Sequence, residues 1–130
     1  MNVVIAMDSF KGNLNSREVA VPVAQGIRRV FPQANIKTVA IADGGEGTTE
    51  ALVDSLAGEY VSAKVHNPVM KKIDARYGII NKNTAVMEKA EASGICLLAK
   101  SGLNPVVART DGSGEVIADS LRRGWAEIIL

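Results

Sequence analysis

Apolar positions follow two different periods in the opening part of the chain. Val3–Met7 is a short, continuous apolar run rich in β-branched residues, which is typical of a buried strand. From Val19 to Phe31 the apolar residues recur every three or four positions, as on the buried face of a helix. Another apolar run, Ile36–Ala42, and a helical segment reaching about Ala57 follow. This strand–helix–strand–helix order predicts a parallel sheet with helices on its faces.

The ends of these two helices carry local signals. Asn15 followed three positions later by Glu18 predicts a capping box at the start of the first helix. Pro22 lies in what would be its second turn, where proline bends a helix or delays its start. Gly58 is the expected C-terminal cap of the second helix.

The pattern changes after Gly58. Tyr60–Val65 and Lys72–Ile80 alternate apolar and polar side chains and predict two strands, and Thr84–Glu88 predicts a third. Short turn sequences separate these strands, which favours antiparallel pairing. We therefore expect an α/β protein with a flavodoxin-like or Rossmann-like start at residues 1–58 and a mixed or antiparallel α/β segment, the start of a second domain, at 59–130.

The last part of the chain predicts one more helix and one more strand. Ser113 is a suitable helix cap, Gly124 a suitable end, and Ala126–Leu130 has the composition of a strand. The sequence stops inside this apolar run, so we expect it to be a fragment of a longer protein. The exposed last strand would then pair with the remainder of the chain or with a second copy.

Composition excludes several functional classes. The chain has 130 residues, 47% of them apolar and 22% charged, with a net charge of +1, which indicates a packed globular domain. It has no basic stripe and only five aromatic residues (one Trp, two Tyr, two Phe), so nucleic-acid binding has little support. It has neither a signal peptide nor an apolar run long enough for a membrane span. With a single cysteine, Cys96, which we expect in the core, the cytoplasm is the expected location.

The chemistry-bearing residues are densest between the second strand and the helix after it. Asp43, Glu46 and three glycines (Gly44, Gly45, Gly47) fall within five positions, directly before Thr48. Glycine allows positive φ and a close backbone approach, and a helix N-terminus presents free N–H groups to an anion. Donors beside carboxylates suit a phosphate that arrives with a metal ion. Ordinary turn chemistry accounts for the same residues equally well.

Four stretches together resemble the bacterial glycerate kinase family. They are Asp8-Ser9-Phe10-Lys11-Gly12, Ala42-Asp43-Gly44-Gly45-Glu46-Gly47-Thr48, the run from Glu88 to Gly94, and Asn104-Pro105 with the later Gly112-Ser113-Gly114-Glu115. The resemblance implies two α/β domains with a cleft between them, one flavodoxin-like. It also implies transfer of the γ-phosphoryl group of ATP to D-glycerate, giving 2-phosphoglycerate.

The chain matches the amino-terminal part of that family, whose members are several times longer. They continue after the last strand into a Gly-Gly-Ser-Ala-Thr-Asn-Asp-Gly-Gly motif that this sequence lacks. We therefore expect little or no kinase activity from these 130 residues alone.

The resemblance also implies roles for individual residues. Asp8 and Lys11 would be catalytic, Asp8 as general base or acceptor of a substrate hydroxyl and Lys11 on a phosphate or the glycerate carboxylate. Asp43 and Glu46 would hold Mg²⁺ or the glycerate hydroxyls, which leaves the base and the metal ligand undecided among the three acids. Substrate or phosphate contacts would come from Ser9, Gly12, Gly44, Gly45, Gly47, Thr48 and Glu88. The implied partners are glycerate, ATP and Mg²⁺.

Some positions depart from the family pattern, and a different function stays open. The departures are Met7, Lys89, Glu91, Arg109 and Asp111. No Gly-x-x-x-x-Gly-Lys-Ser/Thr loop is present, which excludes the ordinary P-loop nucleotide site. The alternative function is a phosphate-binding or nucleotide-binding module without catalysis, because the same glycine-rich turns serve both.

Overall fold

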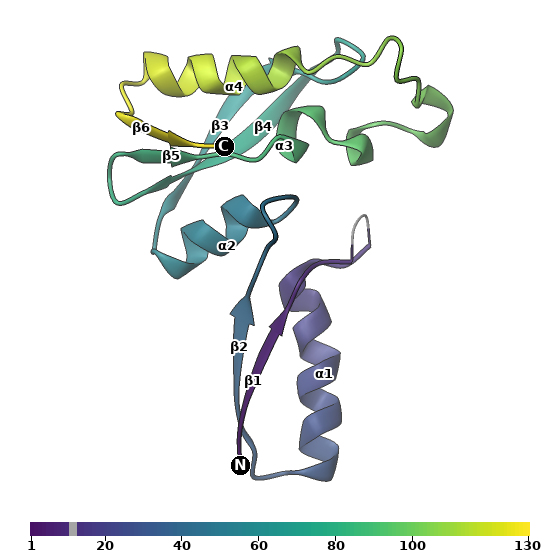
Figure 1. The fold of residues 1–130 in the computed structure, drawn as a ribbon, viewed down its shortest axis with the longest axis vertical. Coiled ribbons are helices and arrows are strands. Elements are labelled where there is room, and N and C mark those ends of the chain that lie inside the picture. Colours follow the sequence, from purple (N-terminus) through teal and green to yellow (C-terminus); the bar gives the residue numbers. More distant parts are fainter. Residues whose placement is uncertain (11–12) are drawn as a thin grey trace. The chain divides into compact units, whose positions relative to one another are not determined.

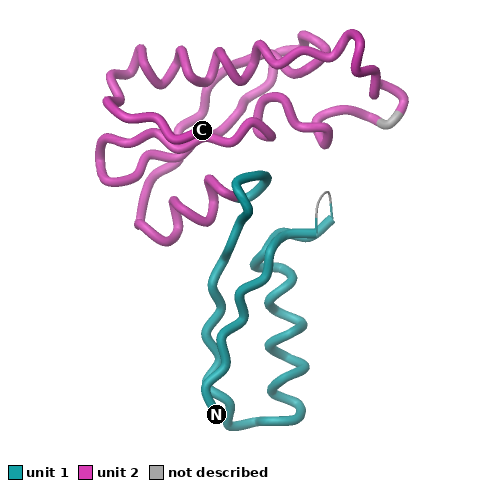
Figure 2. The backbone as a smooth tube through the Cα atoms, viewed as in Figure 1, with its two compact units in different colours: residues 1–47 teal, residues 48–130 magenta. Residues whose placement is uncertain are grey.

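A computed structural model describes residues 1–10 and 13–130 of the chain (Figure 1). The chain divides into two compact units, Met1–Gly47 and Thr48–Leu130, which Figure 2 shows in teal and magenta. The α/β class is confirmed, since one unit holds a parallel sheet and the other a mixed sheet, each with helices. No helix in the described part of the chain is long and apolar enough to cross a membrane.

The first unit is a β–α–β arrangement. Strand β1 (Asn2–Met7) pairs in parallel with β2 (Asn35–Ala40), and α1 (Ser16–Val30) connects them. Alternate side chains of β1 face the helix, so its core consists of Ile5 packed against Ala20 and Ala24, with partly buried neighbours Val3, Met7, Val23, Ile27 and Ile36. The parallel start expected from the sequence is therefore present.

Helix α1 begins with the predicted capping box. The Glu18 amide donates to Asn15 Oδ1 at 2.9 Å, and the Asn15 amide donates to Glu18 Oε2 at 2.8 Å. Two of the four amide groups that a helix start leaves unpaired are satisfied in this way. The helix starts at Ser16 and continues through Pro22, so the proline does not delay its start.

The second unit is a four-stranded sheet with helices. Its elements are α2 (Thr48–Ser55), β3 (Glu59–His66), β4 (Lys72–Ile80), β5 (Thr84–Val86), α3 (Ala90–Ser93), two short 3₁₀ helices (Ile95–Leu97 and Lys100–Gly102), α4 (Asp111–Arg122) and β6 (Glu127–Ile129). The strand order is β3-β4-β5-β6. The first two pairings are antiparallel and β5–β6 is parallel, so this sheet is mixed, as expected.

Helices cover both faces of this sheet. On one face Ala75, Tyr77 and Ile79 of β4 pack with Ala92 of α3 and Val116 of α4. On the other face Ile80 packs with Val86 and with Val53 of α2. The contact of α2 with β4 requires a glycine, because a Cβ at Gly78 would lie 2.2 Å from Val53 Cγ2.

Three local expectations are corrected at helix ends and in the core. Helix α4 begins at Asp111, so Ser113 lies inside it and does not cap it. At the end of α2 the left-handed residue is Ala57 (φ +51°), and the Gly58 amide donates to the Val53 carbonyl at 2.8 Å. Glycine is needed at Gly58 for space, since a Cβ would lie 2.5 Å from the Ile79 carbonyl oxygen. Cys96 is exposed rather than in the core.

The compact units do not divide at the residue where the sequence predicted a domain boundary. The prediction was 1–58 and 59–130, whereas the units divide after Gly47. The difference is helix α2, which packs on β4 through Val53 and Gly78 and so belongs with the second unit. How the complete protein divides into domains stays a prediction.

Candidate functional site

Two of the predicted stretches follow the paired strands of the first unit. Asp8 comes directly after β1, and Asp43 lies three positions after Ala40, the last residue of β2. Because Met7 is in register with Ala40, both stretches leave the carboxyl end of the parallel pair. In α/β proteins that end of the strands is where ligands bind.

The Asp8 carboxylate is held by a local contact. It is half-buried, and its Oδ1 accepts the amide of Ser9 at 2.7 Å. The Ser16 hydroxyl donates to the Met7 carbonyl at 2.5 Å and so ties the start of α1 to the end of β1. Lys11 and Gly12, the other predicted site residues of this stretch, lie outside the described residues.

The glycine-rich turn has the conformation that its sequence predicts. Gly44 and Gly47 have φ of +94° and +90°, a region that other residues rarely adopt. The Gly45 amide donates to Asp43 Oδ1 at 3.0 Å, and a Cβ at Gly45 would lie 3.1 Å from that oxygen. Gly44 and Gly47 are therefore needed for the backbone path, whereas phosphate binding by this turn stays a prediction.

Asp43 and Glu46 are the candidate metal ligands of this turn. Both side chains belong to exposed residues. Within residues 1–10 and 13–130, no group of three or more His, Cys, Asp or Glu side chains is arranged to hold a metal ion. A site built by protein ligands alone is thus not formed in the described chain. Two exposed carboxylates fit the coordination preference of Mg²⁺, which binds one or two carboxylates and completes its coordination shell with water and phosphate oxygens.

In the second unit the structure brings Glu88 next to the residue that follows the predicted glycine-rich stretch. Glu88 follows β5, and its Oε2 accepts the amide of Thr49 at 3.0 Å, although the two residues are 39 positions apart. Thr49 is buried in the first turn of α2, directly after Thr48. The end of β5 and the start of α2 are therefore neighbours.

Parts of the two later stretches that resemble the family line a cavity of about 240 Å³ in the second unit. Ser93 and Gly94, at the end of α3, form one part of its wall, and Asn104 and Pro105 form another. Arg109, for which no role was predicted, also lines the cavity. The cavity is mostly apolar, with a few polar groups at its wall, which is the usual character of small-molecule sites.

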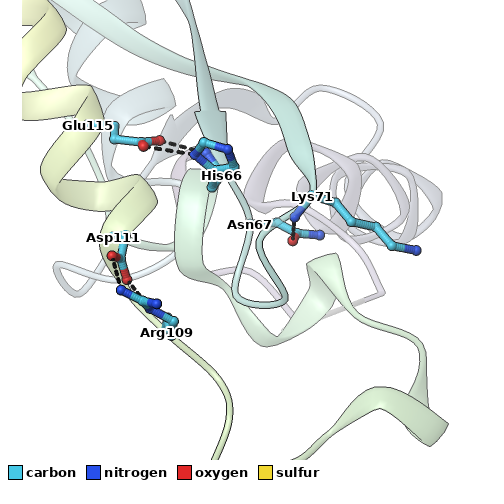
Figure 3. Close-up of polar contacts among 6 residues, drawn as sticks. All are labelled: His66, Asn67, Lys71, Arg109, Asp111 and Glu115. Carbon is cyan, nitrogen blue, oxygen red and sulfur yellow. Dashed lines mark hydrogen bonds and ion pairs between the residues drawn. The ribbon is translucent and has the colours of Figure 1, made fainter.

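A histidine–glutamate contact next to this region was missed in the sequence (Figure 3). His66, at the end of β3, contacts Glu115 of α4 twice: its Nδ1 lies 2.8 Å from Oε1, and its backbone amide donates to Oε2 at 2.7 Å. These hydrogen bonds lower the pKa of Glu115 below its ordinary value. Nothing near His66 in the sequence points to a partner 49 positions away.

The residues around Gly112 show why β3 and α4 meet so closely. A Cβ at Gly112 would lie 1.9 Å from the His66 carbonyl oxygen, so only glycine fits. At the next position, the Ser113 hydroxyl lies 2.8 Å from that of Ser93. Gly112-Ser113-Gly114 lies in the first turn of α4, with Gly112 buried and Gly114 exposed. Anion binding by this turn stays a prediction.

Arg109 and Asp111, two positions at which the sequence departs from the family pattern, form an ion pair with each other. Arg109 donates from Nε to Asp111 Oδ2 at 2.9 Å and from Nη2 to Oδ1 at 2.6 Å, a two-pronged ion pair (Figure 3). The guanidinium lowers the pKa of Asp111, and the carboxylate raises the pKa of Arg109. The Arg109 amide also donates to the Pro68 carbonyl at 3.0 Å. The two substitutions therefore complement each other in charge and in position.

Comparisons with known proteins agree over the whole chain. Residues 3–130 match the model of the glycerate kinase family. A glycerate kinase of Halalkalibacterium halodurans is 41% identical over 98% of this chain and 34% of its own length. The glycerate 2-kinase of Escherichia coli K12 is 40% identical over 100% of this chain and 34% of its own length.

A solved structure gives the same result in three dimensions. The crystal structure of a "putative glycerate kinase 2" from Salmonella typhimurium LT2 superimposes with a TM-score of 0.70 at 37% identity, over 98% of this chain and 34% of that one. This chain thus spans about a third of the length of the relatives it matches. The family-model match and the identity over nearly every residue leave one assignment: this chain belongs to the glycerate kinase family.

Proposed function

We propose that this chain supplies part of an enzyme that phosphorylates D-glycerate with ATP and gives 2-phosphoglycerate. The observation that carries the proposal is the glycine-rich turn with its two carboxylates, at the same end of the β1–β2 pair as Asp8, in a chain of the glycerate kinase family. Phosphoryl transfer demands positioning and charge neutralisation rather than covalent chemistry from the protein, and this residue set fits that demand.

Each predicted site residue has a role in this scheme. Asp8 accepts the proton of the glycerate hydroxyl while that oxygen bonds to the γ-phosphorus and the bond from phosphorus to the β–γ bridging oxygen breaks, releasing ADP. Lys11 neutralises a phosphate or the glycerate carboxylate. Backbone and hydroxyl donors for the anionic groups come from Ser9, Gly12, Gly44, Gly45, Gly47 and Thr48. Glu88 acts within the second unit, where its carboxylate accepts the Thr49 amide at the start of α2.

Asp43 and Glu46 are the residues that would hold Mg²⁺. A bound Mg²⁺ supplies charge neutralisation for the phosphates of ATP. The support for this assignment is chemical: two exposed carboxylates flank a turn whose glycines leave the backbone accessible. Asp43 Oδ1 already accepts the Gly45 amide, which fixes the orientation of that carboxylate.

An assay of ATP-dependent glycerate phosphorylation on the 130-residue chain tests the activity. We expect little or no turnover, because the chain spans about a third of the relatives' length. Fusing the chain to the remaining two thirds of a relative should restore turnover, and Asp43→Asn in that fusion should reduce it. Robust turnover by the isolated chain would contradict the prediction of inactivity.

The alternative is a phosphate-binding module without catalysis, which the preformed turn at Gly44 and Gly47 also supports. Separate titrations of Mg²⁺·ATP, glycerate and inorganic phosphate discriminate between the two functions. A kinase part binds Mg²⁺·ATP or glycerate selectively. A general phosphate module binds inorganic phosphate comparably well and ignores glycerate.

A further inference from the structure

The carboxylate of Glu88 lies where three elements of the second unit meet. Glu88 comes two positions after β5, and the Met87 amide continues that strand's ladder by donating to the Ile129 carbonyl at 3.0 Å. The Glu88 carbonyl accepts the Glu91 amide at 3.3 Å and so starts the turn that becomes α3. Its side chain reaches α2, where Oε2 accepts the Thr49 amide. The backbone on both sides of Glu88 is therefore anchored.

The start of α2 needs an acceptor from elsewhere in the fold. The first amides of any helix have no partner within the helix, and a nearby side-chain oxygen usually accepts one of them. For Thr49 the acceptor is the carboxylate of Glu88, 39 positions away, and a negative charge there is also favoured by the helix dipole. Glu88 thus performs from a distance what Asn15 performs locally for α1.

Packing fixes the rest of this turn. Thr49 is 4% exposed, and its Cγ2 would lie 3.3 Å from a Cβ built on Gly78. Val53, one turn later, is packed even more closely on the same glycine. The first turn of α2 is consequently held by β4 along its side and by Glu88 at its end.

We propose that Glu88 is a positioning residue that fixes the first turn of α2, where the chain arrives from the glycine-rich turn, and that it does not contact the substrate. An anion bound at this helix end would have to displace Glu88 from the Thr49 amide. The phosphate contacts of the proposed function therefore belong to the residues before Thr49. This assignment rests on the proposed function only in its statement about substrate.

Amide exchange measured by NMR tests the anchoring directly. Glu88→Ala should lower the protection of the Thr49 amide by about fivefold or more, the effect of losing one helix cap. Glu88→Gln keeps an acceptor oxygen and should lower it by no more than about twofold. Glu59→Ala, which removes an exposed carboxylate from β3, is the matched control and should change nothing at Thr49. Unchanged Thr49 protection in Glu88→Ala would overturn the proposal.

Titrations of Mg²⁺·ATP and of glycerate on the same variants test the second part of the proposal, that Glu88 does not contact the substrate. A positioning residue predicts that Glu88→Gln binds within about twofold of the unmodified chain, while Glu88→Ala binds about fivefold more weakly. Equal losses in both variants would make Glu88 a direct ligand and overturn the proposal, as would undiminished binding by Glu88→Ala. If the unmodified chain binds neither compound, the proposed function fails, whereas the exchange experiment still decides the anchoring.

Discussion

The two compact units of this chain bury their apolar side chains to very different extents. In residues 1–47 a two-stranded parallel sheet has α1 on one face, and the described core is Ile5 with two alanines. In residues 48–130 helices cover both faces of a four-stranded sheet, and the larger cluster has nine buried residues, eight from β3, β4, β5, α3 and α4 and the ninth Met87. Val4, on the β1 face away from Ile5, is 65% exposed.

This difference matters because parallel sheets normally have both faces covered, and two strands alone are marginally stable. The second unit has the features of an independently stable fold, and the first does not. Yet the first unit carries Asp8, Asp43 and Glu46, the acids of the proposed site. The residues proposed for chemistry therefore lie in the less stable unit of this chain, and the substitutions below test that contrast.

The largest expected effect is in the second unit, at the contact between β3 and α4. Gly112→Ala places a methyl group 1.9 Å from the His66 carbonyl oxygen and should lower the free energy of unfolding by about 3 kcal/mol or more. Gly114→Ala, in the same helix with nothing within 4 Å, should instead stabilise by up to about 1 kcal/mol. Urea unfolding followed by circular dichroism measures both. Similar effects of the two variants would show that β3 and α4 are not in close contact.

The next effect isolates the first unit. Ile5→Ala should cost about 2–3 kcal/mol, because it removes the largest side chain of a three-residue core. Val4→Ala, in the neighbouring exposed position, should change stability by less than about 0.5 kcal/mol. Native-state hydrogen exchange should show the loss of protection in β1, α1 and β2 and not in β3 or β4. An equal loss in both units would mean that the chain unfolds as one cooperative unit, and it would contradict the proposed difference in stability between the two units.

Removing the capping box should have a smaller effect in the same unit. Asn15→Ala takes away the acceptor of the Glu18 amide and should destabilise α1 by about 1 kcal/mol. Asn13→Ala, at an exposed position just before the cap, serves as control. Exchange rates of the first amides of α1 report the result. If both variants exchange alike, the cap contributes nothing measurable to the first unit.

The smallest expected effect is the pH dependence contributed by Glu115. Its pKa is lowered in the folded state by the hydrogen bonds from His66, so it stabilises the fold above its ordinary value of 4.5, and this contribution is lost as pH falls through the lower folded value. Glu115→Gln should therefore flatten the decline of Tm as pH falls below 4.5. The free energy at stake is less than about 1 kcal/mol, because solvent partly screens this half-buried pair. Glu59→Gln is the control, and an unchanged slope in Glu115→Gln would contradict the assignment.

The features that could be predicted from the sequence are those determined by residues close together along the chain. Asn15 and Glu18 are three positions apart, and their capping box is present as expected. The bounds of β4 also match the prediction, because alternation along a half-buried strand is a strong signal. The start of α4 was placed too late, since Ser113 has the composition of a cap but its hydroxyl contacts Ser93 instead.

Contacts between residues far apart in the sequence are the part of the site that could not be predicted. The glycines of the turn were correctly expected to be there for backbone conformation, because positive φ is a property of single residues. The contact of Glu88 with Thr49 and that of His66 with Glu115 join residues 39 and 49 positions apart, and no local pattern encodes them. Cys96 was expected in the core from its apolar neighbours, yet it lies in an exposed 3₁₀ helix.

The turn between β4 and β5 has a consequence for the order of folding. Asn81 and Lys82 both have positive φ, which bends the chain tightly enough for Asn83 to follow with its carbonyl oxygen turned toward β6. That oxygen accepts the amides of Ala126 and Glu127 at 3.2 and 3.4 Å. The hairpin is a local structure that forms early, whereas a parallel strand must return over a long loop. We therefore expect the finished turn to set the register of β6 during folding.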